Sequence, residues 1–286
     1  MEFHLNVSKN EQNKFKQLYI TGLRTGSPLN SINTLELLNR IEQFRKVDLR
    51  TVSEEDLNNH LLLTVKDVSG RIMTLTMSDV LYRVRKLNPD LSNKPTTFDD
   101  VWYPKSHYVD KNNRANKEGE PVLYVSLDMT TPLFECEIKE GDRYALIRYR
   151  IRENRQITLF DFANETYPSG LNDIGKVNFK IIKDFFISEF CKPVGDGTEF
   201  LYRISNCICV NYLDIPDCGG YLYPSIAHFK KGYNIALKPT CADNCLLFDS
   251  VLICQREKYD AAKNEYEYHV LHKADRIKKN MLRYNS

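Results

Sequence analysis

The sequence predicts an α+β fold, in which a small helical lead-in precedes a β-rich core. Apolar residues recur at helical spacing near the front of the chain. Strand-like runs then dominate the middle, and further helical patterns follow among later strands. The 286 residues, 42% hydrophobic and 27% charged, suit one large or two small folded domains.

Two helical patterns open the ordered part of the chain. The first covers 33–46, with a spaced apolar face formed by Leu35, Leu38, Ile41 and Phe44. Asn33, with Glu36 three residues on, is typical of a capped helix start. Ser53 begins the second pattern in the same way, in the stretch "SEEDLNNHLLL". Residues 1–75 are therefore expected to form a helical N-terminal region, with a polar, loosely packed start.

The core follows as a series of short strands. "PVLYVSL", "RYALIRYRI" and "QITLFDF" read as strands, whereas "LYRVRK" at 81–86 fits either a continuing helix or a new strand. The run 143–151 alternates, which places Tyr144, Leu146, Arg148 and Arg150 on one face. Helices are expected at 177–191 and 199–212, and further strands at 219–224, 233–238 and 246–254. The tail 273–286 reads as a basic helix or an exposed strap.

Composition narrows the function classes. With 40 basic and 38 acidic residues the net charge is +2, so a nucleic-acid partner is not expected. The first residues are polar and unlike a signal peptide, and no apolar run reaches the ~18 residues of a membrane span, so we expect a cytoplasmic protein without a membrane partner. The P-loop, G-x-G-x-x-G and H-E-x-x-H motifs are all absent from the sequence.

The eight cysteines do not predict a metal site. Cys207 and Cys209 form C-x-C, and Cys241 and Cys245 form C-x3-C, but neither pair has the second pair of ligands that zinc needs. We therefore expect reduced thiols and no metal.

One segment, "NRANKEGEPVLYVSLDMTTPLFECE" at 113–137, contains residue types that often bind ligands or take part in catalysis. An arginine such as Arg114 binds phosphates bidentately, and a strand tyrosine such as Tyr124 stacks on a flat ring. Glu135, placed after the following turn, would face a sugar or a developing cation. The ordinary interpretation makes Tyr124 a core residue and the two charged residues surface groups.

The order of five segments resembles the RES family, named for its Arg, Glu and Ser. They are "LYRVRK", the segment 113–137, "GDRYALIRYRI", "ITLFDF" and "GGYLYPSIAHFKKGYNIALKP", which ends at Pro239. The resemblance covers roughly 80–255. It implies an ADP-ribosyltransferase-like mixed β core with flanking helices, and divides the chain into 1–75, a catalytic domain at 76–260 and a basic tail at 261–286.

The resemblance implies an enzyme that degrades NAD+ by phosphorolysis or hydrolysis of the nicotinamide–ribose bond. NAD+ would be the substrate and inorganic phosphate a co-substrate, with no other cofactor. Many family members are toxins held by a cognate antitoxin, so an antitoxin partner is an expectation here, and the chain could form a homo-oligomer. The alternatives are an ADP-ribosyltransferase acting on a macromolecule and a non-catalytic interaction module with a degenerate core.

Site roles follow from the same resemblance. The catalytic set would be Arg83, Tyr124, Glu135 and Ser225. The resemblance implies that Arg83 lies where the NAD+ phosphates bind and that the Ser225 hydroxyl donates a hydrogen bond to a phosphate. The residues contacting the dinucleotide would be Arg85, Arg114 and His228. Arg85 competes with Arg83 for the role of the early arginine.

The sequence departs from the family pattern near the glutamate. Pro132 stands where a small residue is usual, and Glu137 is a rival for Glu135. A Gly-Gly also stands in "CGGYLYPS" where Asp-Gly is common.

Overall fold

The chain forms two compact units. The computed structural model describes residues 28–65, 72–162, 167, 169–195, 197–209, 218–260 and 265–285. The helical unit takes its described residues from Met1–Ile72, Asp110–Gly119 and Phe160–Cys218, and the sheet unit from Met73–Val109, Glu120–Leu159 and Gly219–Ser286. Both units are interrupted in sequence, unlike the consecutive segments 1–75, 76–260 and 261–286 that the sequence suggests. Residues 1–27 of the first segment lie outside the described part.

The helical unit contains the two predicted N-terminal helices, α2 (Thr34–Arg45) and α3 (Glu54–Val65). The Asn33 side chain accepts hydrogen bonds from the backbone N–H groups of Leu35 and Glu36, as the capping pattern predicts. The Ser53 hydroxyl accepts from the N–H of Asp56 at 3.0 Å and caps α3 in the same way. Both expectations are confirmed.

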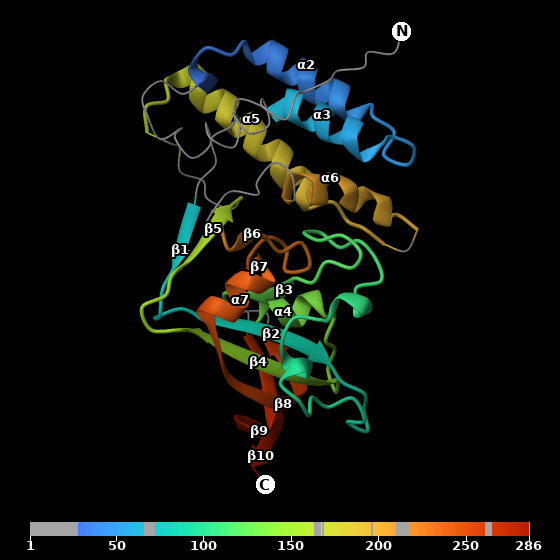
Figure 1. Ribbon diagram of the computed structural model, residues 1–286, viewed down its shortest axis with the longest axis vertical. Helices are drawn as coiled ribbons and strands as arrows, with labels where there is room; N and C mark the ends of the chain where they lie inside the picture. Colours follow the sequence, from blue (N-terminus) through green and yellow to red (C-terminus); the bar gives the residue numbers. More distant parts are fainter. Residues whose placement is uncertain are drawn as a thin grey trace. The chain divides into compact units, whose positions relative to one another are not determined.

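Two later helices complete this unit, α5 (Asp173–Phe190) and α6 (Tyr202–Cys207), with the short 3₁₀ turns η1 (Pro28–Asn30) and η4 (Glu199–Leu201). Figure 1 draws α2 and α3 in blue beside α5 in yellow. The rings of Phe44 and Phe185 meet edge-on at 5.4 Å between centroids, which packs α5 against α2. Asn178 is fully buried and donates to the backbone carbonyls of Leu29 and Ile32. Segments far apart in sequence therefore share one core.

The sheet unit is built around a sheet with the strand order β1-β5-β6-β7-β3-β2-β4-β8-β9-β10. Its strands are β1 (Ile72–Leu75), β2 (Val80–Lys86), β3 (Leu123–Ser126), β4 (Arg143–Ile151), β5 (Ile157–Asp161), β6 (Gly220–Pro224), β7 (Tyr233–Leu237), β8 (Leu246–Asp260), β9 (Glu265–Lys278) and β10 (Met281–Asn285). Its helices are α4 (Thr131–Glu135) and α7 (Pro239–Cys245), with 3₁₀ turns η2 (Asp99–Val101) and η3 (Ser106–Tyr108). The α+β class is confirmed, and "LYRVRK" is a strand.

The short helix α4 packs on part of one face of this sheet, against β2, β3 and β7. Leu133 of α4 and Ile138 beyond it pack with Val84 of β2 and Leu146 of β4 in a buried cluster. The alternation predicted for 143–151 agrees with the register, because Leu146 pairs with Val84 while Ile147 pairs with Arg83. The face that carries Val84 and Leu146 is called the α4 face below.

The tail expectation is wrong. Residues 273–285 belong to β9 and β10, which pair antiparallel around a turn at Lys279 and Asn280. Both turn residues have positive φ, 51° and 64°, as a two-residue hairpin turn requires. Figure 1 shows β8, β9 and β10 in orange to red, and β10 is the edge strand at this side of the sheet.

Candidate functional site

Glu135 ends α4, and local chemistry explains why the helix is so short. The Asp128 carboxylate accepts the backbone N–H groups of Thr130 and Thr131 at 2.9 and 2.7 Å, which caps the start. Pro132 fits the first turn, where no N–H partner is needed. Glu137 has a φ of 48°, so the chain leaves the helix directly after Glu135.

The Glu135 carboxylate is exposed yet held by two buried donors. Ser225 Oγ donates to Glu135 Oε1 at 2.6 Å, and Asn234 Nδ2 donates to the same oxygen at 2.6 Å. Ser225 is fully buried and Asn234 is 7% exposed. The two bonds fix the orientation of a carboxylate whose other oxygen receives no hydrogen bond from the described residues.

Ser225 and Asn234 are themselves held in place. Ser225 Oγ accepts the backbone N–H of His228 at 3.0 Å, so the hydroxyl hydrogen is directed to Glu135. Asn234 Oδ1 accepts from Ser126 Oγ at 3.1 Å, which fixes which end of the amide faces Glu135. A buried polar network therefore supports the exposed carboxylate.

His228 belongs to this support. It is 2% exposed, its ring stacks on Phe134 at 4.5 Å and 14°, and Nδ1 lies 3.0 Å from Thr131 Oγ1. Gly232 permits this packing, because a Cβ there would lie 1.7 Å from Thr131 Oγ1. His228 therefore packs in the interior against α4 and supports the helix that ends at Glu135.

The loop after Ser225 presents an exposed ring beside this network. Phe229 is 76% exposed, and its ring meets Phe134 edge-on at 6.3 Å. Phe229 and Lys230 both have positive φ, 51° and 60°, a conformation that costs free energy for residues with a Cβ. Strained backbone of this kind is concentrated at functional sites.

Tyr124 lies on β3 opposite Ala236 of β7, two residues from Ser126, which lies opposite Asn234. Since side chains two apart in a strand share a face, Tyr124 lies on the same face as Ser126 and Asn234, and Asn234 binds Glu135. The structure thus brings Tyr124, Glu135, Ser225 and His228 to one region of the sheet unit.

Arg83 and Arg85 point to the opposite face of the sheet. Arg83 pairs with Ile147 and Arg85 with Ala145, while the adjacent Tyr82 pairs with Ser126. Since neighbouring residues of a strand lie on opposite faces, the two arginines lie on the face away from Ser126. The Arg83 guanidinium donates to the backbone carbonyl of Trp102. Within the described residues neither arginine makes a hydrogen bond or ion pair with Glu135, although the Arg83 charge acts on the pKa of the neighbouring Cys136.

Arg114 lies in the helical unit. Its guanidinium donates to the Lys192 carbonyl at 3.3 and 3.4 Å and lies over the Tyr202 ring, 5.4 Å from its centroid. These contacts are those of an arginine that ties a loop to a helix.

Cys136 follows Glu135 but is a poor nucleophile. Burial raises the pKa of its thiol to about 11. The Arg83 charge lowers this pKa and the neighbouring Glu135 charge raises it, and burial outweighs both. The thiol donates to the Val84 carbonyl at 3.3 Å. The protonated form dominates near neutral pH, which argues against thiolate chemistry at this position.

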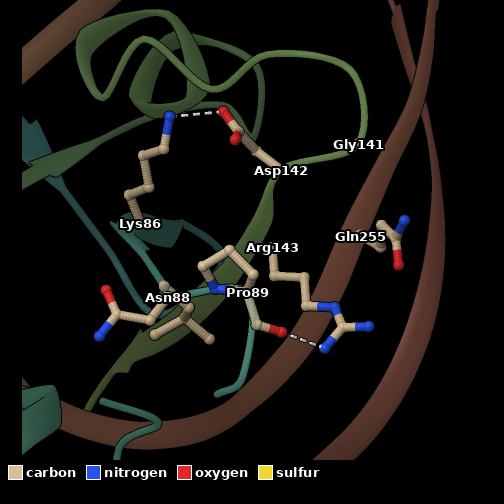
Figure 2. Close-up of a pocket in the computed structure, with 8 residues that line it drawn as sticks. Lys86, Asn88, Pro89, Gly141, Asp142, Arg143 and Gln255 are labelled. Atoms are coloured by element: carbon tan, nitrogen blue, oxygen red, sulfur yellow. Dashed lines mark hydrogen bonds and ion pairs between the residues drawn. The ribbon is translucent and has the colours of Figure 1, made fainter. Parts of the chain in front are cut away.

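A separate hollow of about 420 Å³ lies at the ends of β2 and β4 (Figure 2). Its two cations are already engaged: Lys86 pairs with Asp142 at 2.5 Å, and Arg143 donates to the Pro89 carbonyl. The hollow does not contain Glu135 or its partners.

Asn234 is a residue of this network that the sequence does not predict. It opens the "NIAL" stretch of β7, and nothing local to the sequence marks it as a partner of a glutamate 99 positions earlier. Only the pairing of β7 with β3 places it there.

Comparisons with family models, with curated proteins and with solved structures found no match. Among the described residues, no helix has the length and apolar character needed to cross a bilayer. Within the same residues, no cluster of three or more His, Cys, Asp or Glu side chains is suited to a metal ion.

Proposed function

We propose that the protein is an NAD+-degrading enzyme with an ADP-ribosyltransferase-like core, in which Glu135 promotes cleavage of the nicotinamide–ribose bond. The observation that carries the proposal is the exposed Glu135 carboxylate, oriented by the buried Ser225 and Asn234. A carboxylate held in one orientation suits a reaction with a good leaving group, because such a reaction needs no general acid. The order of segments that resembles the RES family adds support.

The proposed cleavage needs only NAD+ and water or phosphate. The bond between C1′ of the ribose and the pyridinium nitrogen breaks, and its electron pair leaves with neutral nicotinamide. The oxocarbenium character that develops at C1′ is stabilised by the negative charge of Glu135. An oxygen of water or phosphate then bonds to C1′. With water, a proton passes to solvent and ADP-ribose forms, whereas phosphate gives the phosphorylated sugar.

Ser225 acts in this scheme as a positioning residue. Its hydroxyl hydrogen is committed to Glu135 and its oxygen accepts the His228 N–H. In this scheme Ser225 orients Glu135, whereas the resemblance implies that its hydroxyl donates a hydrogen bond to a phosphate.

The test is incubation of the purified full chain with NAD+ in phosphate buffer and in phosphate-free buffer, with products resolved by mass. We expect release of nicotinamide in at least one buffer, and the mass of the sugar product identifies the acceptor. Intact NAD+ in both buffers would overturn the proposal and leave a binding module as the better explanation. The ADP-ribosyltransferase alternative would instead show transfer to a macromolecule only when one is added.

A further inference from the structure

The hairpin of β9 and β10 gathers cations on one face. Arg276 lies directly opposite Arg283, and Lys278 lies two positions beyond Arg276 on the same face. Lys273 belongs to this face too, because it pairs with Asn285, which lies two positions from Arg283. The turn between the strands adds a fifth cation. These five residues, Lys273, Arg276, Lys278, Lys279 and Arg283, are called the basic face below.

A β-bulge assembles the basic face. The register shifts between Arg283 and Tyr284, so Asp275 is an extra residue in β9 between Ala274 and Arg276. In a regular strand, Lys273 and Arg276 would point to opposite faces because they are three positions apart. The extra residue places both on one face.

The basic face is open to solvent. Lys273 pairs with Leu252 of β8, which pairs with Leu146 of β4, so this is the α4 face of the sheet. Helix α4 itself packs against β2, β3 and β7, and β4 and β8 separate those strands from the hairpin. The side chains of all five cationic residues are exposed. On the opposite face of the hairpin, Ala274 and Leu282 are buried.

The charges of this face do not stabilise the hairpin. Like charges directly opposite each other on neighbouring strands are destabilising, and Arg276 and Arg283 form such a pair. Lys273 has an ion-pair partner, Asp275, at 3.2 Å. The other four cations make no ion pair within the described residues. An excess of positive charge of this kind suits an external anion.

Protection of a sheet edge does not explain the cations. Charged side chains on an edge strand prevent its pairing with another chain. The edge of β10 is already occupied, because the Leu282 N–H donates to the Thr96 carbonyl at 2.8 Å and the Phe98 N–H donates to the Asn280 carbonyl at 2.9 Å. The segment 96–98 therefore covers this edge, and the cations lie on a face that it does not need to protect.

The composition of the basic face fits phosphate groups better than a protein surface. Protein interfaces have an apolar and aromatic centre and are depleted in lysine, whereas interfaces with DNA are much more positively charged. Between residues 273 and 285, Met281 is the apolar side chain on this face. Tyr284 lies on the other face and donates to the Pro95 carbonyl, so it offers no ring for stacking on unpaired bases.

We propose that the basic face binds the phosphate backbone of double-stranded DNA without reading its sequence. Arginine binds a phosphate bidentately and lysine acts as a point charge. The net charge of +2 predicts no such partner, but it is a sum over the whole surface, and exposed charges more than about 10 Å apart are largely screened. RNA duplexes are recognised largely through their 2′-hydroxyl groups, which cations alone do not distinguish. The inference is independent of NAD+ cleavage.

The test is the fluorescence anisotropy of a labelled DNA duplex titrated with the full chain at salt concentrations from about 50 to about 200 mM. We expect the logarithm of the binding constant to fall with the logarithm of salt with a slope of about −3 to −4, because each neutralised phosphate contributes about −0.9. The double variant Arg276→Gln/Arg283→Gln should flatten this slope by about 2 and weaken binding about tenfold or more at the lowest salt.

The double variant Arg152→Gln/Arg155→Gln is the matched control. It removes the same charge from exposed positions between β4 and β5 and should keep the wild-type slope. Arg276→Glu separates binding from folding: it places opposite charges across the hairpin, so it should raise the urea midpoint while it weakens DNA binding.

Three results would overturn the proposal. They are a wild type without salt-dependent DNA binding, equal losses in the two double variants, and tighter binding to an RNA duplex of the same length. Binding to polyglutamate but not to DNA, lost in Arg276→Gln/Arg283→Gln, would identify an acidic protein as the partner instead. If that double variant fails to fold, Lys278→Gln/Lys279→Gln takes its place with the same expectation.

Discussion

Ser225 Oγ lies 2.6 Å from Glu135 Oε1, although the two residues are 90 positions apart. The hydroxyl is fully buried and the carboxylate is exposed. An interior donor therefore holds a surface acid in one orientation, and Asn234 does the same from β7.

Glu135→Gln should abolish most of the NAD+ cleavage while leaving the fold intact. Removing one electrostatic stabiliser of a transition state typically lowers kcat by about 10²–10³-fold. The residue is exposed, so the free energy of unfolding should change little. Nicotinamide release and urea denaturation measure the two effects.

Glu137→Gln is the matched control for Glu135. Glu137 is also exposed but has turned away from the helix at a φ of 48°. Its replacement should leave kcat within about twofold, since surface changes are usually small. A larger loss for Glu137→Gln than for Glu135→Gln would show that Glu137 is the working acid.

Ser225→Ala should lower both activity and stability. Glu135 loses one of its two anchors, and the His228 N–H loses its acceptor. An unsatisfied buried N–H costs about 1–3 kcal/mol of unfolding free energy. We expect kcat for NAD+ cleavage to fall more than KM changes.

Ser205→Ala separates these two effects. Ser205 is equally buried, and its hydroxyl donates to the Tyr202 carbonyl in the helical unit. It should cost stability without changing kcat at a temperature where both variants are folded. Equal losses of kcat in the two variants would mean that Ser225 acts only through folding.

Phe229→Ala should weaken substrate binding without affecting stability. The ring is 76% exposed beside Phe134, so it is available to a flat ligand group. Loss of an aromatic contact worth about 1 kcal/mol should raise KM for NAD+ about fivefold. Tyr108→Ala removes another exposed ring, 71% exposed on η3, and should leave KM unchanged. A KM unaffected by Phe229→Ala would exclude the ring from the site.

Alkaline pH should destabilise the fold through Cys254. Burial raises the pKa of this thiol from 9.0 to about 12. Above pH 9 the unfolded chain loses the proton while the folded chain keeps it, so the free energy of unfolding falls as pH rises toward 12. The slope from one such group is at most about 1.4 kcal/mol per pH unit.

Urea denaturation of the wild type and of Cys254→Ala at pH 8, 9 and 10 measures this slope. Cys254→Ala should be less stable at pH 8 but should lose less stability with rising pH. Cys245→Ala, which removes a partly exposed thiol on α7, should keep the wild-type slope. Parallel pH curves for the wild type and Cys254→Ala would contradict the expectation.

Elements with local signals could be predicted from the amino-acid sequence. The capped starts at Asn33 and Ser53 need only side chains two or three positions from their backbone partners. The alternation of 143–151 reports one strand with two different faces, because the side-chain period of a strand is two. The strand position of Tyr124 follows in the same way.

The tail shows where local signals fail. Residues 265–285 carry charges on both faces, so no apolar stripe marks them as strands. Their pairing with each other and with β8 supplies the stabilisation that periodicity does not reveal. The sequence therefore suggested a helix or strap where a hairpin forms.

Which residues meet at the candidate site depends on strand pairing between distant parts of the chain. The order of strands placed Asn234 beside Ser126 and within reach of Glu135, and the register turned Arg83 and Arg85 to the other face. A shift of one residue in register would exchange these faces, and the register cannot be predicted from the residues of a single strand. Residue types are fixed along the chain, but which of them meet depends on long-range backbone pairing.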